Sequence, residues 1–342
     1  MTIGLKLSIC VATFNRGGFI SETLDSIVAQ IQPDVELVVV DGASTDDTFE
    51  RMTEFKSRHP CVRYVREPQN SGVDRDFDKA VSYAEGEYVW LMTDDDLMVA
   101  GAVQRVLEVL DGRYELVIVN SEVRSADLSK VLNRRLLDVV EDNEYTNETC
   151  EALFVDTARA LTFIGSVVIK RQVWLARHRS AYYGTLFIHV GVIFQSPPIG
   201  RVRVIADPAL QIRYGVAMWT SRSFDVWMFK WPELIWSFRG YSEATKAQIT
   251  RKEPWRSPMK LFQFRSKNAY SIDEYRKNLA NVPGVYRILA LIISVFPGPV
   301  ANVLSIVYLT IRAPSNRTPL YDLVNAQRWP PLRRFMLRWF RL

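Results

Sequence analysis

Residues 88–96 read YVWLMTDDD, so five apolar side chains run directly into three aspartates. A short apolar run bounded by polar residues indicates a buried β-strand. Residues 7–12 and 35–40 are two more runs of this kind, and they end at the polar segment 13–16 and at Asp41. Ligands of α/β sheets bind beyond the carboxyl ends of the strands. The three polar clusters therefore predict one shared site at one edge of a sheet.

Expected strands and helices alternate through the first 120 residues. This alternation predicts an α/β fold of Rossmann-like type, with a mostly parallel sheet flanked by helices. After residue 122 the pattern loosens into shorter elements. The elements that we expect are strands at 7–12, 35–40, 62–66, 88–92, 115–120, 166–170 and 201–206, and helices at 18–29, 45–58, 73–84, 99–110, 148–161, 171–179 and 224–238.

Length and composition narrow the class of protein. A chain of 342 residues suits one catalytic domain with an appendage. The net charge of +5 favours an anionic partner, such as nucleotide phosphates or lipid headgroups. The three cysteines are widely spaced and form no CxxC pair, which favours reduced thiols of a cytosolic protein over a disulfide frame or a zinc site. Residues 5–12 are too short to be a signal peptide.

The three aspartates Asp94, Asp95 and Asp96 repel one another unless a cation compensates their charge. A hard divalent ion, Mg²⁺ or Mn²⁺, takes oxygen ligands and can bridge to a diphosphate. The alternative is a helix cap, with Asp96 as the N-cap of the helix expected at 99–110. Asp41 suits either a contact to a nucleobase or ribose or a plain Asp-Gly turn.

The segment 13–16 reads Thr-Phe-Asn-Arg, and its side chains suit either a base pocket, with Arg16 near phosphate, or a loop that caps the next helix. Together with VDGAST at 40–45, Asn70-x-Gly72 and the run from Ala84 into the aspartates, it forms an ordered set of motifs. This set, over residues 7–97, resembles family 2 of the glycosyltransferases.

The resemblance implies a GT-A fold, a divalent metal and inversion at the anomeric carbon of the sugar. It implies that Thr13, Phe14, Asn15 and Arg16 border the nucleotide and that Asp41 contacts the base. Asp94 and Asp96 would form the DxD pair, with Asp96 the direct metal ligand and with Asp94 and Asp95 on the nucleotide-sugar side.

Two segments depart from the family pattern. Many members have Arg-Asn where this chain has Phe77-Asp78, and residues 72–78 with the triple aspartate look more like the bacterial abequosyltransferases of lipopolysaccharide O-antigen synthesis. Arg75 is then the candidate for phosphate or sugar contacts. The second departure is the missing Glu-Asp pair that supplies the base in many members.

Inverting transfer needs a group that takes the proton of the acceptor hydroxyl. His189, in the comparable region, is our candidate base; a metal ligand or a histidine packed in an apolar strand are the alternatives. Glu122 is a reserve candidate on the acceptor side. Gly165 and Ser166 are candidates for the lining of the acceptor pocket.

The C-terminal region is apolar and basic. Residues 285–296 and 300–311 are apolar runs separated by Pro-Gly-Pro, and each is shorter than the roughly 20 residues of a membrane-spanning helix. They predict a helical hairpin that dips into a membrane or lies on it, or alternatively a buried dimer interface. The tail 328–342 mixes arginines with large apolar groups, which suits anionic lipid. The aromatic residues of 219–236 suit packing against this hairpin.

We therefore expect a GT-A domain over 1–220, with a nucleotide-sugar half at 1–122 and an acceptor half at 123–220, followed by a helical membrane-associating region at 221–342. The expected activity is transfer of a sugar, with a deoxysugar as one option, from a nucleoside-diphosphate sugar to a lipid-linked or polysaccharide acceptor. We expect a peripheral or monotopic protein at the cytoplasmic face of the inner membrane. A homo-oligomer is one option for its assembly state.

Two other functions compete with this expectation. A sugar nucleotidyltransferase needs a Gly-rich basic loop after the first strand, but residues 13–19 hold one arginine and no lysine. A catalytically inactive membrane adaptor would explain the missing base. Nucleic acid is not an expected partner, because the basic residues cluster in the apolar tail.

Overall fold

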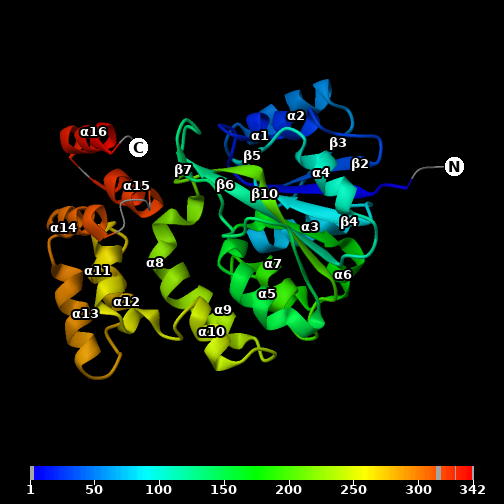
Figure 1. Cartoon of the computed structure of the whole chain (residues 1–342). Helices are drawn as coiled ribbons and strands as arrows, with labels where there is room; N and C mark the ends of the chain where they lie inside the picture. Colours follow the sequence, from blue (N-terminus) through cyan, green and yellow to red (C-terminus); the bar gives the residue numbers. More distant parts are fainter. Residues whose placement is uncertain (1–3, 313–316, 328, 341–342) are drawn as a thin grey trace. The chain divides into compact units, whose positions relative to one another are not determined.

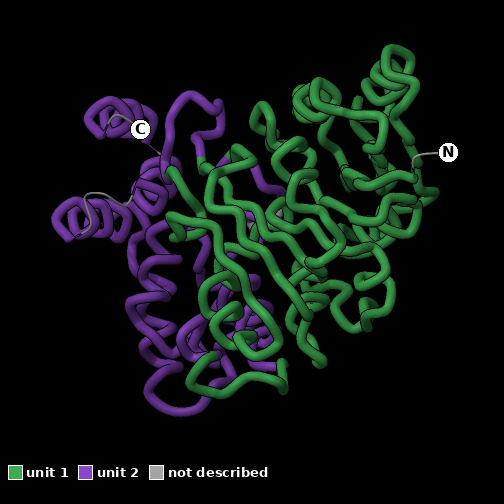
Figure 2. The backbone as a smooth tube through the Cα atoms, turned by 45° about the vertical axis from the view of Figure 1, so that its right-hand side comes forward, with its two compact units in different colours: residues 1–123, 134–213, 238–245 green, residues 124–133, 214–237, 246–342 purple. Residues whose placement is uncertain are grey.

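The computed structural model describes residues 4–312, 317–327 and 329–340. The chain divides into two compact units (Figure 2): unit 1 comprises residues 1–123, 134–213 and 238–245, and unit 2 comprises 124–133, 214–237 and 246–342. The division that we expected at residue 220 is simpler than this one, because the segments 124–133, 214–220 and 238–245 belong to the unit on the other side of that boundary.

Unit 1 is built on a mixed sheet with the strand order β3-β2-β1-β4-β9-β6-β10-β5 (Figure 1). The four strands β1 to β4 are parallel neighbours, as the alternating pattern predicts. The second half is antiparallel, because β9 runs opposite to both β4 and β6, and β10 runs opposite to β5 and β8. The strands are β1 (Leu7–Thr13), β2 (Val35–Asp41), β3 (Val62–Arg66), β4 (Tyr88–Met92), β5 (Leu97–Met98), β6 (Leu116–Arg124), β8 (Asn143–Tyr145), β9 (Val167–Lys170) and β10 (Val202–Arg213).

Apolar side chains of the sheet and its helices form the core of unit 1. Ile20 and Leu24 of α1, Phe55 of α2 and Val106 of α4 are fully buried against strand residues such as Val39. Burial of such side chains is the main stabilising term of the fold. The helices are α1 (Ile20–Val28), α2 (Thr48–Arg58), α3 (Val73–Tyr83), α4 (Ala102–Val109), α5 (Cys150–Thr157), α6 (Arg171–Ala176) and α7 (Ile188–Phe194), with short 3₁₀ turns at Asn147–Thr149, Ala160–Thr162, Ile164–Ser166 and Arg179–Tyr182.

Unit 2 is mostly helical. Phe224, Tyr270 and Leu279 are centres of one buried cluster, and Ile306, Leu323 and Met336 belong to another. Its elements are β7 (Val131–Asn133), α8 (Ser223–Asp225), a π-helical turn (Val226–Lys230), α9 (Trp231–Ser237), α11 (Pro258–Ser266), α12 (Ile272–Asn278), α13 (Val285–Val295), α14 (Gly298–Arg312), α15 (Arg317–Asn325) and α16 (Pro330–Trp339), with 3₁₀ turns at Met218–Arg222 and Pro254–Arg256; α10 (Glu243–Ile249) has residues in both units.

The expected apolar hairpin is present as α13 and α14. Among the described residues no helix is by itself long and apolar enough to cross a bilayer, whereas α13 and α14 together meet that test but bend by 99° at their junction. The outer side chains of both helices are exposed, as at Ile288 (55%) and Val307 (51%). The expected tail 328–342 lies partly outside the described residues, and its described part contains α16.

Candidate functional site

The parallel register brings the predicted polar clusters together. Thr13 pairs with Asp41 at the ends of β1 and β2, and β4 lies on the other side of β1. The backbone N–H of Phe14 donates to Asp94 Oδ2 at 3.4 Å, which joins the end of β1 to the aspartates that follow β4. The expectation of one shared site at this edge of the sheet is therefore met for these segments.

Asn15 organises the loop that follows β2. Its side-chain oxygen accepts hydrogen bonds from the backbone N–H of Thr45 at 2.7 Å and of Asp46 at 3.3 Å, and its own N–H donates to Ser44 Oγ at 2.9 Å. Asn15 has a φ of 55°, a left-handed conformation that asparagine tolerates better than most residues. The residue that we expected to border the nucleotide thus shapes the loop 44–46.

Arg16 faces the aspartates. Its guanidinium lies 3.4 Å from Asp94 Oδ1 and 3.1 Å from Asp95 Oδ2, and these three side chains keep only 11–13% exposure. Arg213, at the end of β10, donates from Nε to the carbonyl of Asp95 at 2.9 Å. Sequence reasoning missed Arg213, because nothing local distinguishes it from the other arginines.

The carboxyl groups of this cluster are short of positive charge. Burial, with repulsion from Asp95, raises the pKa of Asp94 to about 7, and the opposing effect of Arg16 does not cancel this rise. Burial likewise raises the pKa of Asp95 and of Asp96. Since a divalent cation would supply the missing charge, these carboxylates fit Mg²⁺ or Mn²⁺.

The protein alone does not complete a metal cage: no three Asp, Glu, His or Cys side chains are gathered as a ligand set in the part of the chain that the structure describes. Mg²⁺ sites commonly use one or two carboxylates, with substrate phosphates and water as the other ligands. The cluster fits a metal that is held together with a diphosphate.

Asp96 differs from its two neighbours. Its Oδ2 accepts a hydrogen bond from the Thr93 hydroxyl, and its Oδ1 accepts one from the backbone N–H of Arg213 at 2.6 Å. The side chain therefore joins β10 to the end of β4. The alternative of Asp96 as a helix N-cap is wrong, because β5 intervenes and α4 begins after Gly101, whose φ of 79° suits glycine.

Asp41 is buried in a network of its own. Tyr64 donates its hydroxyl hydrogen to Asp41 Oδ2 at 2.6 Å, and the backbone N–H of Ser44 donates to Oδ1 at 2.7 Å. Burial and this contact raise the pKa of Tyr64. Tyr64 and the nearby Arg66, whose Nε lies 3.9 Å from Asp41 Oδ2, are site residues that the sequence did not single out.

The acidic helix α3 holds the segment 174–188. Asp74 accepts hydrogen bonds from the backbone N–H groups of Gly184 (2.8 Å), Leu186 (2.9 Å) and Ile188 (3.1 Å). Asp78 accepts from Trp174 Nε1 at 2.9 Å, from Arg179 Nε at 2.6 Å and from the Tyr183 hydroxyl, while the guanidinium of Arg75 lies over the ring of Tyr183 at 4.9 Å. The spacing of Asp74, Asp76 and Asp78 was the only sequence signal for this function of the helix.

His189 lies in helix α7 and not in a strand. It is 1% exposed, and its Nε2 lies 2.6 Å from the carbonyl oxygen of Leu161. Burial lowers its pKa to about 4, so the ring is neutral at neutral pH. Its Nδ1 has no hydrogen-bond partner within the described chain.

The remaining acceptor-side residues lie on or beside the sheet. Gly165 is buried beside β4, where its carbonyl accepts from Trp90 Nε1 at 2.8 Å, and Ser166 is fully buried. Glu122 is half-buried on β6. The assignment of these residues to an acceptor pocket stays a prediction.

Comparison with known proteins covers most of the first half of the chain. The family model of glycosyl transferase family 2 matches residues 8–161. Over these residues the chain is similar to glycosyltransferase family 2. This match contains the segment 13–16, Asp41 and all three aspartates.

Curated relatives agree with this assignment. The chain is 27% identical over 208 residues to an abequosyltransferase of Salmonella typhimurium, with 56% of this chain and 62% of that protein covered. It is 27% identical over 145 residues to a GalNAc(5)-diNAcBac-PP-undecaprenol beta-1,3-glucosyltransferase of Campylobacter jejuni, covering 42% of this chain and 46% of the relative. The matches thus span less than two thirds of these relatives.

Solved structures share the GT-A fold. Residues 1–349 of S. aureus TarS in complex with UDP align with a TM-score of 0.53 at 18% identity, covering 95% of this chain and 93% of that one. A Pyrobaculum calidifontis mannosyltransferase in complex with GDP-Man and Mn²⁺ aligns with a TM-score of 0.52 at 17% identity, covering 95% and 87% of the chains. The expected fold class is confirmed, with a mixed rather than a mostly parallel sheet.

Proposed function

We propose that the protein is an inverting glycosyltransferase that moves a sugar from a nucleoside-diphosphate sugar onto a lipid-linked or polysaccharide acceptor in the synthesis of cell-surface polysaccharide. The observation that carries this proposal is the buried aspartate cluster, whose raised pKa values call for a cation at the carboxyl edge of a family 2 domain. Two relatives support this proposal: an abequosyltransferase, and a glucosyltransferase named for a saccharide linked to PP-undecaprenol. The second supports a lipid-linked acceptor, and the first leaves a deoxysugar as an option for the donor.

We assign Asp94 and Asp95 to the metal and diphosphate, in place of the Asp96 that the family resemblance favours. Asp96 is 3% exposed and accepts hydrogen bonds on both oxygens, whereas the side chains of Asp94 and Asp95 keep 13% and 11% exposure beside the guanidinium of Arg16. A bound Mn²⁺ or Mg²⁺ would neutralise charge that develops on the departing diphosphate. Arg16 adds a fixed positive charge at the same place.

The chemical step exchanges one bond at the anomeric carbon for another. The oxygen of the acceptor hydroxyl bonds to this carbon, the bond to the diphosphate oxygen breaks, and the hydroxyl proton passes to a base. His189 is the base that we propose, because its neutral ring has an unpartnered Nδ1 in the described structure. The low pKa makes His189 a weak base. Substitution of His189 tests this assignment directly.

The first experiment is a thermal-shift panel of UDP, GDP, CDP and dTDP with Mn²⁺. We expect one nucleotide to raise the melting temperature in a metal-dependent way, and Asp95→Asn to abolish that shift. Glu85→Gln, which changes an exposed carboxylate, is the matched control and should keep it. A shift that survives in Asp95→Asn would overturn the assignment of the cluster.

Product analysis separates the competing functions. The proposed enzyme releases a nucleoside diphosphate from a nucleotide-sugar. A sugar nucleotidyltransferase would instead release pyrophosphate from a nucleoside triphosphate and a sugar phosphate. An inactive adaptor would bind the nucleotide and release neither product.

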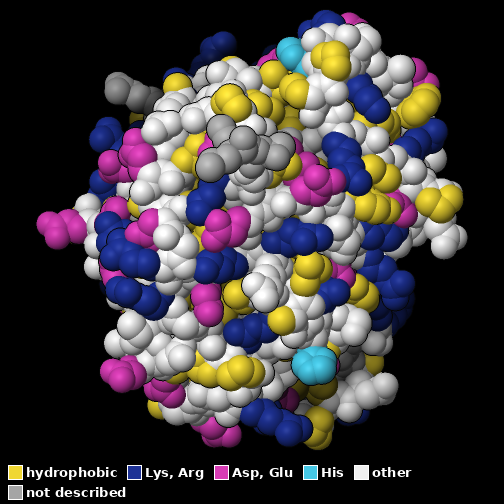
Figure 3. Space-filling model, turned by 90° about the vertical axis from the view of Figure 1, so that its right-hand side faces the viewer, with side chains coloured by type: hydrophobic (Ala, Val, Ile, Leu, Met, Phe, Trp, Pro, Cys, Tyr) yellow, Lys and Arg dark blue, Asp and Glu magenta, His cyan; other side chains and the backbone are white. Residues whose placement is uncertain are grey.

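We also propose that unit 2 binds the cytoplasmic face of the inner membrane. Residues 285–342 contain eight arginines, no lysine and one acid, Asp322, whose carboxylate is paired with Lys267 at 2.6 Å. Phe335 and Trp339 of α16 are exposed by 59% and 70% beside these arginines. By contrast, the face of the molecule drawn in Figure 3 intersperses acidic with basic side chains.

Flotation with vesicles tests this membrane proposal. We expect the protein to float with vesicles that contain phosphatidylglycerol and to stay behind with pure phosphatidylcholine. Failure to float with either kind of vesicle would favour the alternative of a dimer interface, which light scattering would detect as a mass of two chains.

A further inference from the structure

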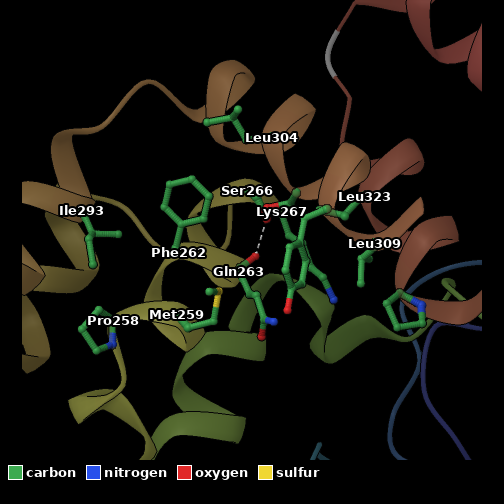
Figure 4. Close-up of a pocket in the computed structure, with 13 residues that line it drawn as sticks. Pro258, Met259, Phe262, Gln263, Ser266, Lys267, Ile293, Leu304, Leu309 and Leu323 are labelled. Carbon is green, nitrogen blue, oxygen red and sulfur yellow. Dashed lines mark hydrogen bonds between the residues drawn. The ribbon is translucent and has the colours of Figure 1, made fainter. Parts of the chain in front are cut away.

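Unit 2 contains a cavity of about 710 Å³ among α11, α13, α14 and α15 (Figure 4). Its wall is mostly apolar and includes Phe262, Ile293, Leu309 and Leu323. Lys267 is the one charged side chain among the described residues of the wall, and its ammonium is bound to Asp322 at 2.6 Å. Cavities of this size and lining are typical of sites for apolar ligands.

The mouth of the cavity belongs to the exposed apolar surface of α14. Leu304 and Tyr308 both line the cavity and are exposed by 52% and 48%. Met259 of α11, exposed by 54%, lines it from the opposite wall. An apolar ligand can therefore pass from the surface into the cavity without crossing a charged rim at these residues.

An arginine lies one helical turn beyond the mouth residue Tyr308. Leu304, Tyr308 and Arg312 follow one another at intervals of four residues on α14, so they share one face of the helix. Arg312 is exposed at the last residue of α14. The mouth thus offers apolar contact along its length and a guanidinium at its end, which suits a hydrocarbon chain attached to a phosphate.

We propose that this cavity takes up one acyl chain of an anionic membrane phospholipid, with the lipid phosphate held at Arg312. The charge of the region decides between occupants. A second copy of this chain would bring another arginine-rich segment against the first, and the two would repel. The bilayer supplies both the chain and the compensating anion. The proposed site lies wholly in unit 2 and does not depend on the transferase activity.

Native mass spectrometry of the full-length protein tests the proposal. The protein is equilibrated in detergent with an equimolar mixture of phosphatidylglycerol and phosphatidylcholine. We expect one phospholipid per chain, with phosphatidylglycerol preferred. Gln263→Trp, at an exposed position of the wall, should fill the mouth and reduce occupancy at least ten-fold. Val303→Trp, at an exposed neighbour outside the lining, is the matched control and should retain the lipid.

A second pair of variants tests the headgroup. Arg312→Gln should remove the preference for phosphatidylglycerol, whereas Arg287→Gln, at an exposed arginine of α13, should keep it. If the Gln263→Trp chain does not fold by circular dichroism, Ser305→Phe blocks the cavity from α14 instead. The proposal is overturned if the wild type carries no lipid or if blocked and control variants retain equal amounts. A dimer that dissociates in Gln263→Trp would assign the cavity to a second copy and equally overturn it.

Discussion

Replacing Asp74 by asparagine should weaken the hydrogen bonds that hold the start of α7 and the residues before it. Asp74 is 3% exposed, and its two carboxylate oxygens accept backbone hydrogen bonds from Gly184, Leu186 and Ile188 at 2.8–3.1 Å. Asparagine keeps a single oxygen acceptor and turns an NH₂ donor toward at least one of these N–H groups. The residue is nearly isosteric, so the main change is in charge and in hydrogen bonding.

The expected cost follows from these contacts. A hydrogen bond to a charged acceptor contributes about 1.5–3 kcal/mol, and a buried donor without a partner costs about 1–3 kcal/mol. Because these two terms overlap in part, we expect Asp74→Asn to lower the free energy of unfolding by about 3 kcal/mol. Activity should also fall, because α7 carries the candidate base His189.

Urea unfolding followed by circular dichroism at pH 7 measures this cost. Asp76→Asn is the matched control, since Asp76 lies on the same helix and is 2% exposed, but burial raises its pKa. Removing a charge that burial disfavours should change the stability by less than about 1 kcal/mol. Equal losses in both variants, or a loss below about 1 kcal/mol in Asp74→Asn, would refute the reasoning.

The remaining predictions concern three single residues. The pKa of His189 falls from 6.5 to about 4 on folding, so its contribution to stability is present above pH 6.5 and is lost as the pH falls toward 4. The expected loss in the free energy of unfolding is about 3 kcal/mol. In a series of urea unfolding curves at different pH values, His189→Gln should remove this dependence of stability on pH. If His189 is also the base, the same variant should lower kcat at least 100-fold, measured as nucleoside-diphosphate release. In Gly86→Ala the added methyl carbon would lie 2.6 Å from Ser8 Oγ and 2.8 Å from the backbone of β1. We expect this clash to lower the free energy of unfolding by about 1–3 kcal/mol, measured by a thermal melt. Gly4→Ala, where the methyl group meets open space, should leave the stability unchanged. Asp94→Asn should raise stability at pH 7 in the absence of metal. Folding raises the pKa of the Asp94 carboxyl to about 7, so its ionisation lowers the stability of the wild type as the pH rises from about 4 to 7. A melting temperature of the variant below that of the wild type at pH 7 would contradict this prediction.

Short apolar runs in the sequence predicted the buried strands of the parallel half of the sheet. The strands β1, β2 and β4 and the polar residues that follow them agree with the structure, because short apolar runs in a parallel sheet are buried on both faces. The same reasoning failed at His189. All seven residues of α7 are buried, so the segment shows no helical periodicity that would separate it from a strand.

Contacts between distant residues could not be read from the sequence. Arg213 reaches the aspartate cluster across 117 positions, and its partners depend on the antiparallel pairing of β10 with β5. The different parts played by Asp94, Asp95 and Asp96 were hidden for the same reason, since three identical side chains in a row differ only in what folding places beside them. The structure separates them by the N–H of Arg213 on one side and the guanidinium of Arg16 on the other.

The acids of α3 hold a neighbouring segment at the place where this chain departs from the expected family pattern. The donors that surround Asp78 are an indole N–H, a guanidinium and a phenol, from Trp174, Arg179 and Tyr183. A carboxylate can accept from all three, whereas an asparagine would turn a donor toward one of them. Since Asp74 binds the next part of the same segment, one face of α3 fixes the backbone from residue 174 to residue 188. These contacts fix the path of a segment that leads directly into α7, the helix that carries His189.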